Sequence, residues 1–261
     1  REVALKCLYK IDKEDAYSNI VLDEMLNENR RRLDERDIGL ISEIVYGVVT
    51  WRLTLDEIIR KYSNIRLKKI STWILNILRM GVYQIIFLDK IPKSAAVNES
   101  VNLAKRYGHK SSSNFVNAIL RKVEKTDYEE LFNIDNDVER ISKTTSMPVW
   151  IIEELLKEKK IEEVQEICEA SNSRPNISIR VNNLKTTKEK LKEELKKNDI
   201  QVEDGILDDF LVIKKVKNIE NFDLFKKGFF TIEDEGAGLI PIVLAPKQNE
   251  VVLDACSAPG G

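Results

Sequence analysis

The sequence predicts a multidomain protein: an all-α helical bundle, then a small α+β domain, then the first strand of a Rossmann-like α/β domain. Three observations predict this order. Apolar residues recur at helical spacing in the first half, alternate with polar residues from residue 176, and form one short continuous run at 251–253. The expected boundaries are 1–125 for the bundle, 126–175 for a helical connector, 176–234 for the α+β domain and 235–261 for the start of the last domain.

The first 125 residues are expected to form helices that pack their apolar faces together. Asp34 and Asp37 suit the start of a helix that continues through the apolar stripe 40–48. The stretch 70–86 is apolar nearly all round, which is typical of the buried central helix of a bundle. Gly81 within it indicates a close helix–helix contact, because Gly costs about 1 kcal/mol relative to Ala in a helix. Further helices are expected at 3–11, 21–26, 95–107 (after Pro92) and 115–120, with a polar turn at 108–113.

The connector is expected to hold two short helices, the first beginning near Pro148 with Trp150 on its apolar face. Trp51 and Trp73 are likewise expected in the core. From residue 176 the pattern changes: Ile177, Ile179 and Val181 alternate with polar residues, which predicts a half-buried strand.

A charged helix with Leu191 and Leu195 facing inward follows this strand. Short strands are then expected at 201–202, 210–213 and 228–232, an order typical of a split βαβ, RRM-like sheet. A helix over 235–244 leads to Val251-Val252-Leu253-Asp254, a run typical of the buried first strand of a parallel sheet.

Charge is divided unevenly along the chain. The net charge is −2, but residues 1–125 hold 23 Lys/Arg against 16 Asp/Glu, and residues 126–261 hold 19 against 28. The first half is therefore +7 and the second −9, which favours a polyanionic partner for the bundle. Arg30-Arg31-Arg32 is the densest basic run; it could contact phosphate or be a solvated turn.

Composition limits the class of protein. Cys7, Cys168 and Cys256 form neither a disulfide framework nor a metal-binding pair, and Cys7 and Cys168 suit core packing. His109, the only histidine, lies in a polar stretch and is expected to be solvated. No long apolar segment suggests a membrane span. We expect a cytoplasmic protein that is monomeric and binds no metal.

The last eight residues, Asp254-Ala255-Cys256-Ser257-Ala258-Pro259-Gly260-Gly261, carry the chemical signal. Small residues directly after a strand let the backbone approach a nucleoside cofactor, and free N–H groups can bind its carboxylate. The spacing matches neither GxGxxG nor GxxxxGK[ST], which argues against a dinucleotide fold and against an NTPase. A plain Gly-Pro turn is the alternative on pattern alone.

This string resembles the D-x-C-[AS]-A-P-G-G loop of RNA cytosine-5 methyltransferases. Other segments agree in order. Those in the first half resemble the NusB-like domain that heads the RsmB/Sun (Fmu) branch: 33–37, 45–48, 51–52, 79–84, 95–99 and 114–121. Those in the second half resemble the approach to its methyltransferase core: 147–150, 180–182 and 233–235. Glu233 departs from the family, which usually has Gln there.

The resemblance implies S-adenosylmethionine-dependent methylation of cytosine C5 in small-subunit rRNA, with the bundle helping to place the RNA. It implies a cysteine thiolate that adds to C6 of a base held out of its stack. The family's two working cysteines are expected beyond Gly261, so no catalytic residue is expected here and residues 1–261 should be inactive. Asp254 and Cys256–Gly261 are expected to bind the cofactor. Arg180 and Asn182 could bind RNA from the polar face of a strand or simply lie on an exposed face.

Two other classes of protein remain open. A non-enzymatic RNA-binding or antitermination factor built on the NusB fold explains residues 1–125 but not residues 126–261. A helical protein-interaction scaffold explains the bundle but not the cofactor loop.

Overall fold

The computed structural model describes residues 1–173, 176–214, 219 and 222–257. The chain divides into two compact units, Arg1–Ser173 and Arg174–Gly261, and each is described by itself. Pro175, predicted to end a helix, lies outside the described residues.

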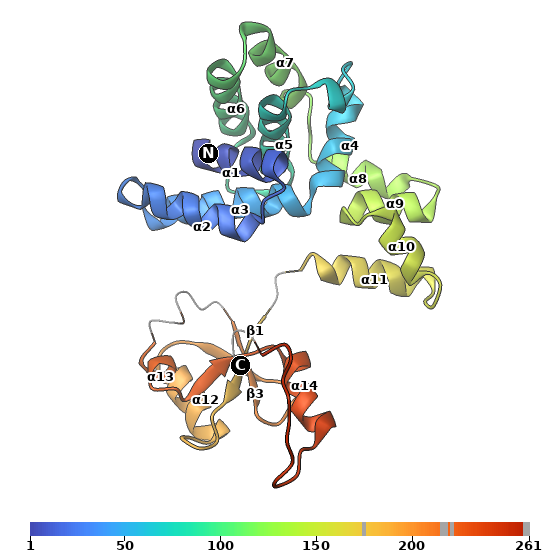
Figure 1. Cartoon of the computed structure of the whole chain (residues 1–261). Coiled ribbons are helices and arrows are strands. Elements are labelled where there is room, and N and C mark those ends of the chain that lie inside the picture. The colour runs from blue at the N-terminus through green and yellow to red at the C-terminus, as the bar shows by residue number, and fades with distance from the viewer. Residues whose placement is uncertain (174–175, 215–218, 220–221, 258–261) are drawn as a thin grey trace. The chain divides into compact units, whose positions relative to one another are not determined.

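The first part of unit 1 is a bundle whose central helix is α5 (Thr72–Phe87) (Figure 1). This helix packs against five others, and all but four of its side chains are buried, as its apolar sequence predicts. Gly81 permits the approach of α7: a Cβ on it would lie 2.4 Å from Leu120 Cδ1, so the predicted close contact is confirmed. The other bundle helices are α1 (Glu2–Glu14), α2 (Ser18–Asn29), α3 (Glu35–Thr50), α4 (Arg52–Tyr62), α6 (Lys93–Tyr107) and α7 (Lys110–Leu120), with 3₁₀ turns at Arg30–Arg32 and Leu67–Lys69.

Local signals in the sequence account for several helix starts. Asp34 caps α3 by accepting a hydrogen bond from the Asp37 backbone N–H at 2.7 Å, as predicted. Pro92 precedes α6, and its fixed φ suits that position. The polar turn predicted at 108–113 is wrong for its second half, because α7 already begins at Lys110. Ser113 is buried there and donates to the Lys110 carbonyl at 2.9 Å.

Helix α4 was not predicted, because its buried face is partly polar. Thr54 and Asp56 are buried on it together with apolar residues. Asp56 accepts two hydrogen bonds from the Arg79 guanidinium, at 2.7 and 2.9 Å, and Asp12 accepts a third at 3.1 Å. A bidentate Arg–carboxylate pair satisfies both charges inside the bundle, and the pair joins α4 to α5.

The connector contains more helices than the two predicted. It has α8 (Thr126–Glu130), a 3₁₀ turn (Leu131–Asn133), α9 (Asp137–Thr145), α10 (Val149–Leu155) and α11 (Ile161–Ser171). Ile141, Ile152, Val164 and Cys168 form a small core of their own. The prediction that Trp150 is a core residue is wrong, because it is 68% exposed. Trp51 and Trp73 do pack against the main core.

The connector also packs on α4. Thr54 Oγ1 donates to the Lys143 carbonyl at 2.7 Å, and Lys143 Nζ lies 2.9 Å from Glu57 Oε1. Helices α8 to α11 therefore belong to the same compact unit as the bundle.

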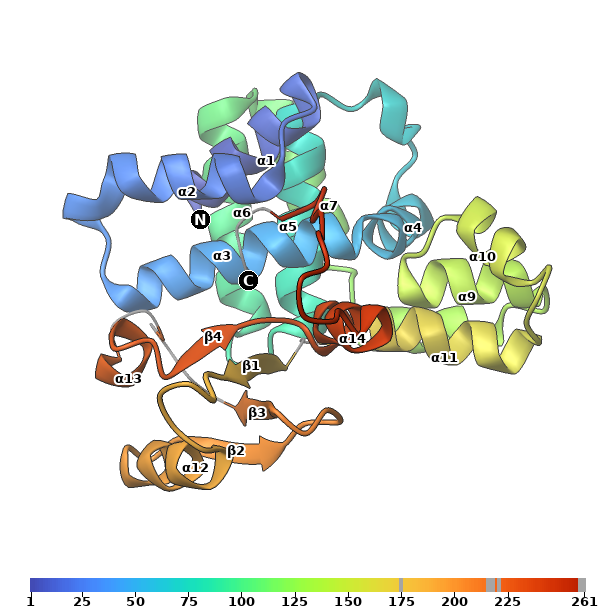
Figure 2. The same cartoon turned by 60° about the horizontal axis from the view of Figure 1, so that its bottom comes forward.

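Unit 2 holds a four-stranded antiparallel sheet in the order β2-β3-β1-β4, seen in Figure 2. The predicted split βαβ arrangement is confirmed, because β3 lies between β1 and β2 and pairs antiparallel with both. Ile179, Val181, Leu211 and Ile213 form a core with Leu191 and Leu195 of the predicted charged helix. The elements are β1 (Ile177–Val181), α12 (Lys188–Lys197), β2 (Gln201–Asp204), β3 (Phe210–Lys214), α13 (Asp223–Lys226), β4 (Phe230–Ile232) and α14 (Glu235–Leu244).

Candidate functional site

The segment predicted to hold a cofactor follows α14, and its described residues, Asp254 and 256–257, are exposed. Asp254 Oδ1 accepts a hydrogen bond from the Cys256 backbone N–H at 3.0 Å, which closes a tight turn. Cys256 and Ser257 are exposed beside it. The predicted ligands Ala258, Pro259, Gly260 and Gly261 lie outside the described residues. A carboxylate followed by small residues with an accessible backbone is compatible with the beginning of a cofactor loop.

Residues 251–253 do not form the predicted strand. Val251 is 100% exposed, Val252 51% and Leu253 87%, and none of them pairs with the described sheet. A strand requires hydrogen-bonded neighbours, so an apolar run cannot become one in isolation.

Helix α14, which leads into this loop, is fixed to the small domain at its first turn. Asp234 caps it by accepting a hydrogen bond from the Gly236 backbone N–H at 2.7 Å. Glu235 Oε1 accepts hydrogen bonds from the backbone N–H groups of Ile206 and Leu207, at 2.5 and 3.2 Å. These two residues lie in the turn between β2 and β3, so one carboxylate ties that turn to the helix.

A second contact supports this anchor. A Cβ on Gly238 would lie 2.4 Å from Phe210 Cζ, so the absence of a side chain allows the Phe210 ring to pack against α14. Phe210 is buried. Neither the contact of Glu235 with this turn nor that of Phe210 with Gly238 was predicted from the sequence. An acid in the first turn of a helix was a visible signal, but no pattern links it to a turn about 30 residues earlier.

The far side of α14 exposes apolar side chains. Ile240 is 67% exposed and Val243 82% exposed, and Leu239, Ile242 and Leu244 are also exposed. A contiguous exposed apolar patch of this kind is typical of an interaction surface or of a ligand-binding groove.

Arg180 and Asn182 are held by internal contacts rather than left free for a ligand. Arg180 Nε lies 3.2 Å from Glu233 Oε2, and Arg180 Nη1 donates to Glu233 Oε1 at 3.4 Å. The Oε2 contact is electrostatic, since no hydrogen bond reaches that buried atom. Asn182 Nδ2 donates to the Gly228 carbonyl at 2.9 Å, and Asn182 Oδ1 accepts from the Leu184 backbone N–H at 3.2 Å. Asn182 therefore stabilises a turn.

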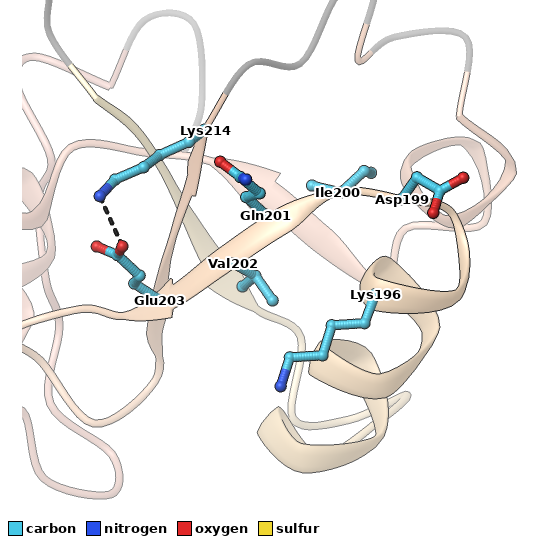
Figure 3. Close-up of a pocket in the computed structure, with 7 residues that line it drawn as sticks. All are labelled: Lys196, Asp199, Ile200, Gln201, Val202, Glu203 and Lys214. Carbon is cyan, nitrogen blue, oxygen red and sulfur yellow. Dashed lines mark hydrogen bonds and ion pairs between the residues drawn. The ribbon is translucent and has the colours of Figure 1, made fainter.

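A shallow hollow of about 660 Å³ runs along the edge strand β2. Figure 3 shows Glu203 and Lys214 facing each other on one side of this strand and Val202 pointing to the other. The Lys214 Nζ to Glu203 Oε1 distance is 2.6 Å. The hollow offers an ion pair and backbone groups, and nothing in it suits a catalytic step.

The remaining sequence candidates belong to the first unit, Arg1–Ser173. Arg30, Arg31 and Arg32 form an exposed 3₁₀ turn after α2. His109 is exposed, as predicted, at the start of α7.

The three cysteines differ in their surroundings. Cys7 and Cys168 are buried, as predicted, and burial raises the pKa of the Cys7 thiol to about 11. Burial also raises the pKa of Cys168. A nucleophilic cysteine needs a lowered pKa, so neither residue suits that role. Cys256 is exposed within the candidate loop.

Within the described ranges, no group of three or more His, Cys, Asp or Glu side chains could hold a metal ion. In the same residues, no single helix is long and apolar enough to cross a membrane; α3 and α4, bent by 79° at their junction, meet the length and composition criteria only as a pair.

Two family models match the chain. Residues 1–125 match the NusB family, and residues 147–220 match the ferredoxin-like domain of RsmF/B-like methyltransferases. The second match begins just before α10 and continues past β3.

Curated relatives match along the whole chain. The chain is 34% identical over 261 residues to the probable ribosomal RNA small subunit methyltransferase B of Bacillus subtilis (strain 168). It is 29% identical over 263 residues to the protein of the same name from Synechocystis sp.. It is 28% identical over 264 residues to the ribosomal RNA small subunit methyltransferase B of Shewanella oneidensis. Each alignment covers 100% of this chain and 58% of the relative, so the chain spans a little over half the length of these proteins.

The fold has a counterpart among solved structures. The crystal structure of PH0851 aligns with a TM-score of 0.62 at 19% identity, covering 95% of this chain and 56% of that one. This likeness supports the fold.

Proposed function

We propose that this chain, which belongs to the RsmB/Sun (Fmu) family, is part of an enzyme that methylates C5 of a cytosine in small-subunit rRNA with S-adenosylmethionine. The observation that carries the proposal is the similarity of all 261 residues to relatives named ribosomal RNA small subunit methyltransferase B. The string from Asp254 to Gly261, which resembles the family's cofactor loop, supports S-adenosylmethionine as the methyl donor. We propose that this enzyme is cytoplasmic and monomeric.

The residues of this chain would hold the reactants. Asp254 and Cys256–Gly261 would bind the cofactor, which supplies the methyl group when bound. Asp234 and Glu235 would fix the direction in which the chain leaves the small domain towards that loop. The bundle would bind the RNA, and its net charge of +7 suits a phosphate backbone.

The covalent step would need a thiolate that the described residues do not offer. Cys7 and Cys168 are buried with raised pKa values, and Cys256 lies in the cofactor loop itself. The thiol that adds to cytosine C6 would therefore come from residues outside this sequence, and residues 1–261 alone would transfer no methyl group.

Methyl transfer by the complete gene product tests the proposal. The protein would be incubated separately with unmethylated small-subunit rRNA and with tRNA, each with S-adenosylmethionine labelled in the methyl group, and the digested RNA analysed by mass spectrometry. We expect 5-methylcytidine, reduced by Asp254→Ala in the cofactor loop. Label on another atom, or on tRNA but not rRNA, would contradict the assigned substrate.

A NusB-like RNA-binding factor without catalysis is the second candidate, favoured by the family match over residues 1–125. The ferredoxin-like domain and the full-length relatives count against it. RNA binding without methyl transfer by the complete gene product would support it.

Among the proposed RNA contacts, Arg30, Arg31 and Arg32 are exposed and available. Arg180 and Asn182 are weaker candidates, since each would have to give up an internal partner.

A further inference from the structure

The positive charge of the bundle is concentrated in its last two helices. Residues 90–125 contain eight Lys/Arg and two Glu, a net charge of +6. The first 89 residues contain 15 Lys/Arg and 14 Asp/Glu, a net charge of +1. Nearly all of the excess that suits a polyanion therefore lies on α6, α7 and the turns beside them. The run Arg30–Arg32 is surrounded in sequence by acids.

These helices enclose a groove of about 410 Å³. Lys93, Ser94 and Asn98 line it from α6, and Asn117 and Arg121 line it from α7 and its end. Lys93 is held by an ion pair with Glu124. Arg121 and the next residue, Lys122, are exposed, and no described residue pairs with either side chain.

Two side-chain amides, Asn98 and Asn117, line this groove, and each has a second amide near it on its own helix. Asn98 and Asn102 are four residues apart on α6, and Asn114 and Asn117 are three apart on α7, so each pair lies on one face of its helix. The described protein supplies no hydrogen-bond partner for any of these four side chains. Each amide offers two donors and one acceptor oxygen, which suits the edges of bases and the 2′-hydroxyls of RNA.

The composition of this face favours RNA over a protein partner. Protein interfaces centre on buried aromatic and aliphatic anchors and have few charges in their core. The exposed large apolar residues of the described chain lie elsewhere, and none falls between residues 90 and 125. The groove is lined by cations and side-chain amides, which is the chemistry that binds phosphates and reads unpaired nucleotides.

We propose that the groove between α6 and α7 binds a single-stranded segment of RNA, with Arg121 and Lys122 on phosphates and Asn98 and Asn117 on bases or riboses. This inference rests on the proposed function, in which the bundle binds RNA, and it assigns the contact surface. It places the main contact on α6 and α7 rather than on Arg30–Arg32.

The test compares two pairs of cations that each follow the end of a helix. Binding of the 261-residue chain to a fluorescently labelled single-stranded RNA of mixed sequence is measured by anisotropy at several salt concentrations. The variant is Arg121→Gln/Lys122→Gln, and Arg30→Gln/Arg31→Gln tests the rival surface. The control is Lys68→Gln/Lys69→Gln, which removes the same charge from another exposed turn, Leu67–Lys69. Circular dichroism melts establish that all three variants are folded.

We expect the first variant to bind more weakly and its slope of log K against log salt to become shallower by about 1.4, or 0.7 for each lost phosphate contact. The Lys68→Gln/Lys69→Gln control should keep the wild-type slope, and Arg30→Gln/Arg31→Gln should change it less than Arg121→Gln/Lys122→Gln does. Asn98→Ala/Asn117→Ala should weaken binding by a similar factor at every salt concentration, because uncharged contacts release no counterions.

The outcomes separate this inference from the proposal beneath it. If the wild-type chain binds RNA and Arg30→Gln/Arg31→Gln is the variant that weakens it, the assignment to α6 and α7 is wrong while RNA binding stands. If Arg121→Gln/Lys122→Gln and Arg30→Gln/Arg31→Gln weaken RNA binding equally, the assignment of the contact to α6 and α7 is also wrong. If the wild-type chain binds no RNA at any salt concentration, both this inference and the RNA-binding part of the proposed function fall.

Discussion

Gly81 and Gly39 are both helical glycines, but their surroundings differ. A Cβ on Gly81 would lie 2.4 Å from Leu120 Cδ1, whereas a Cβ on Gly39 would meet nothing within 4 Å. Replacing a helical Gly by Ala gains about 1 kcal/mol of helix propensity, and overpacking a core costs about 1–3 kcal/mol. We expect Gly81→Ala to destabilise the protein by about 1 kcal/mol and Gly39→Ala to stabilise it by up to about 1 kcal/mol. Urea denaturation of the two variants checks the sign; stabilisation by Gly81→Ala would contradict the observed packing.

Asp127 is a buried carboxylate that joins α4 to the connector. It is 3% exposed and accepts hydrogen bonds from Lys61 Nζ at 2.6 Å, Tyr62 Oη at 2.7 Å and the Glu124 backbone N–H at 2.8 Å. Burial raises the pKa of this carboxyl group, but these hydrogen bonds outweigh burial and lower its pKa below the ordinary value of 3.8.

The lowered pKa predicts a pH dependence. The stabilisation from Asp127 is complete above the ordinary value and is lost as pH falls through the lower pKa of the folded state. Asp127→Asn should cost about 1.5–3 kcal/mol at neutral pH, the range for hydrogen bonds to a charged group. The difference from wild type should shrink as pH falls below about 4. Urea melts across this range test it, and a difference that grows in acid would refute the account.

At the scale of elements, the anchor of α14 is the feature that bears on the cofactor loop. Glu235→Gln keeps the shape of the side chain but removes the charge that accepts from Ile206 and Leu207. We expect faster amide hydrogen exchange at these two residues and a loss of about 1–2 kcal/mol, because the turn is partly exposed. Glu193→Gln, on the exposed side of α12, is the control and should leave both properties unchanged. Unchanged exchange in Glu235→Gln would show that Phe210 and Gly238 hold the helix alone.

The connector and the bundle form one unit, which bears on where the first domain ends. We propose, from its complete apolar stripes, that residues 1–125 unfold cooperatively by themselves. They should melt below residues 1–173, because Thr54 loses its acceptor at Lys143 and Lys61 loses Asp127. A loss of about 2–3 kcal/mol corresponds to roughly 5–10 °C for a domain of this size. Thermal melts of the two polypeptides compare them; the absence of a cooperative transition in the shorter one would reject this boundary.

Elements with a strong apolar period could be predicted from the sequence, and elements that depend on distant partners could not. Helix α5 and strand β1 follow directly from their patterns, and Leu191 and Leu195 are buried where the period places them. Helix α4 was not predicted because Asp56 interrupts the apolar pattern of its buried face. Asp56 is buried there with Arg79 as its hydrogen-bond partner, and Arg79 lies 23 residues later in the sequence. The run at 251–253 has the composition of a strand, but strand formation requires neighbours, and the described chain provides none.

The candidate site was foreseen as a string of residues rather than as a geometry. The turn between Asp254 and Cys256 is local, so sequence could suggest it. The anchor of α14 arises from the fold of the small domain, which brings Glu235 to the turn between β2 and β3. No spacing within the loop encodes that contact.

For the whole molecule, the decisive question is how much of the cofactor site these 261 residues provide. Val251 and Leu253 are almost fully exposed, as is Val243 on α14, so the apolar surface near the loop faces solvent. Cofactor sites bury most of their ligand's surface in a concave, largely apolar pocket. The hollow along β2 is open and charged, and most residues that line the groove between α6 and α7 are polar or charged.

We therefore expect calorimetric titration of the 261-residue chain with S-adenosylmethionine to give a dissociation constant weaker than about 1 mM, a binding free energy smaller than about 4 kcal/mol in magnitude. The complete gene product should bind far more tightly under the same conditions, because residues outside this sequence would cover Val251–Leu253 and the outer face of α14. Asp254→Ala in the complete protein should weaken that binding, whereas Asp208→Ala, on the turn between β2 and β3, should not. Micromolar binding by residues 1–261 would show that these residues already form a complete site. The expectation that further residues must cover the cofactor would then be wrong.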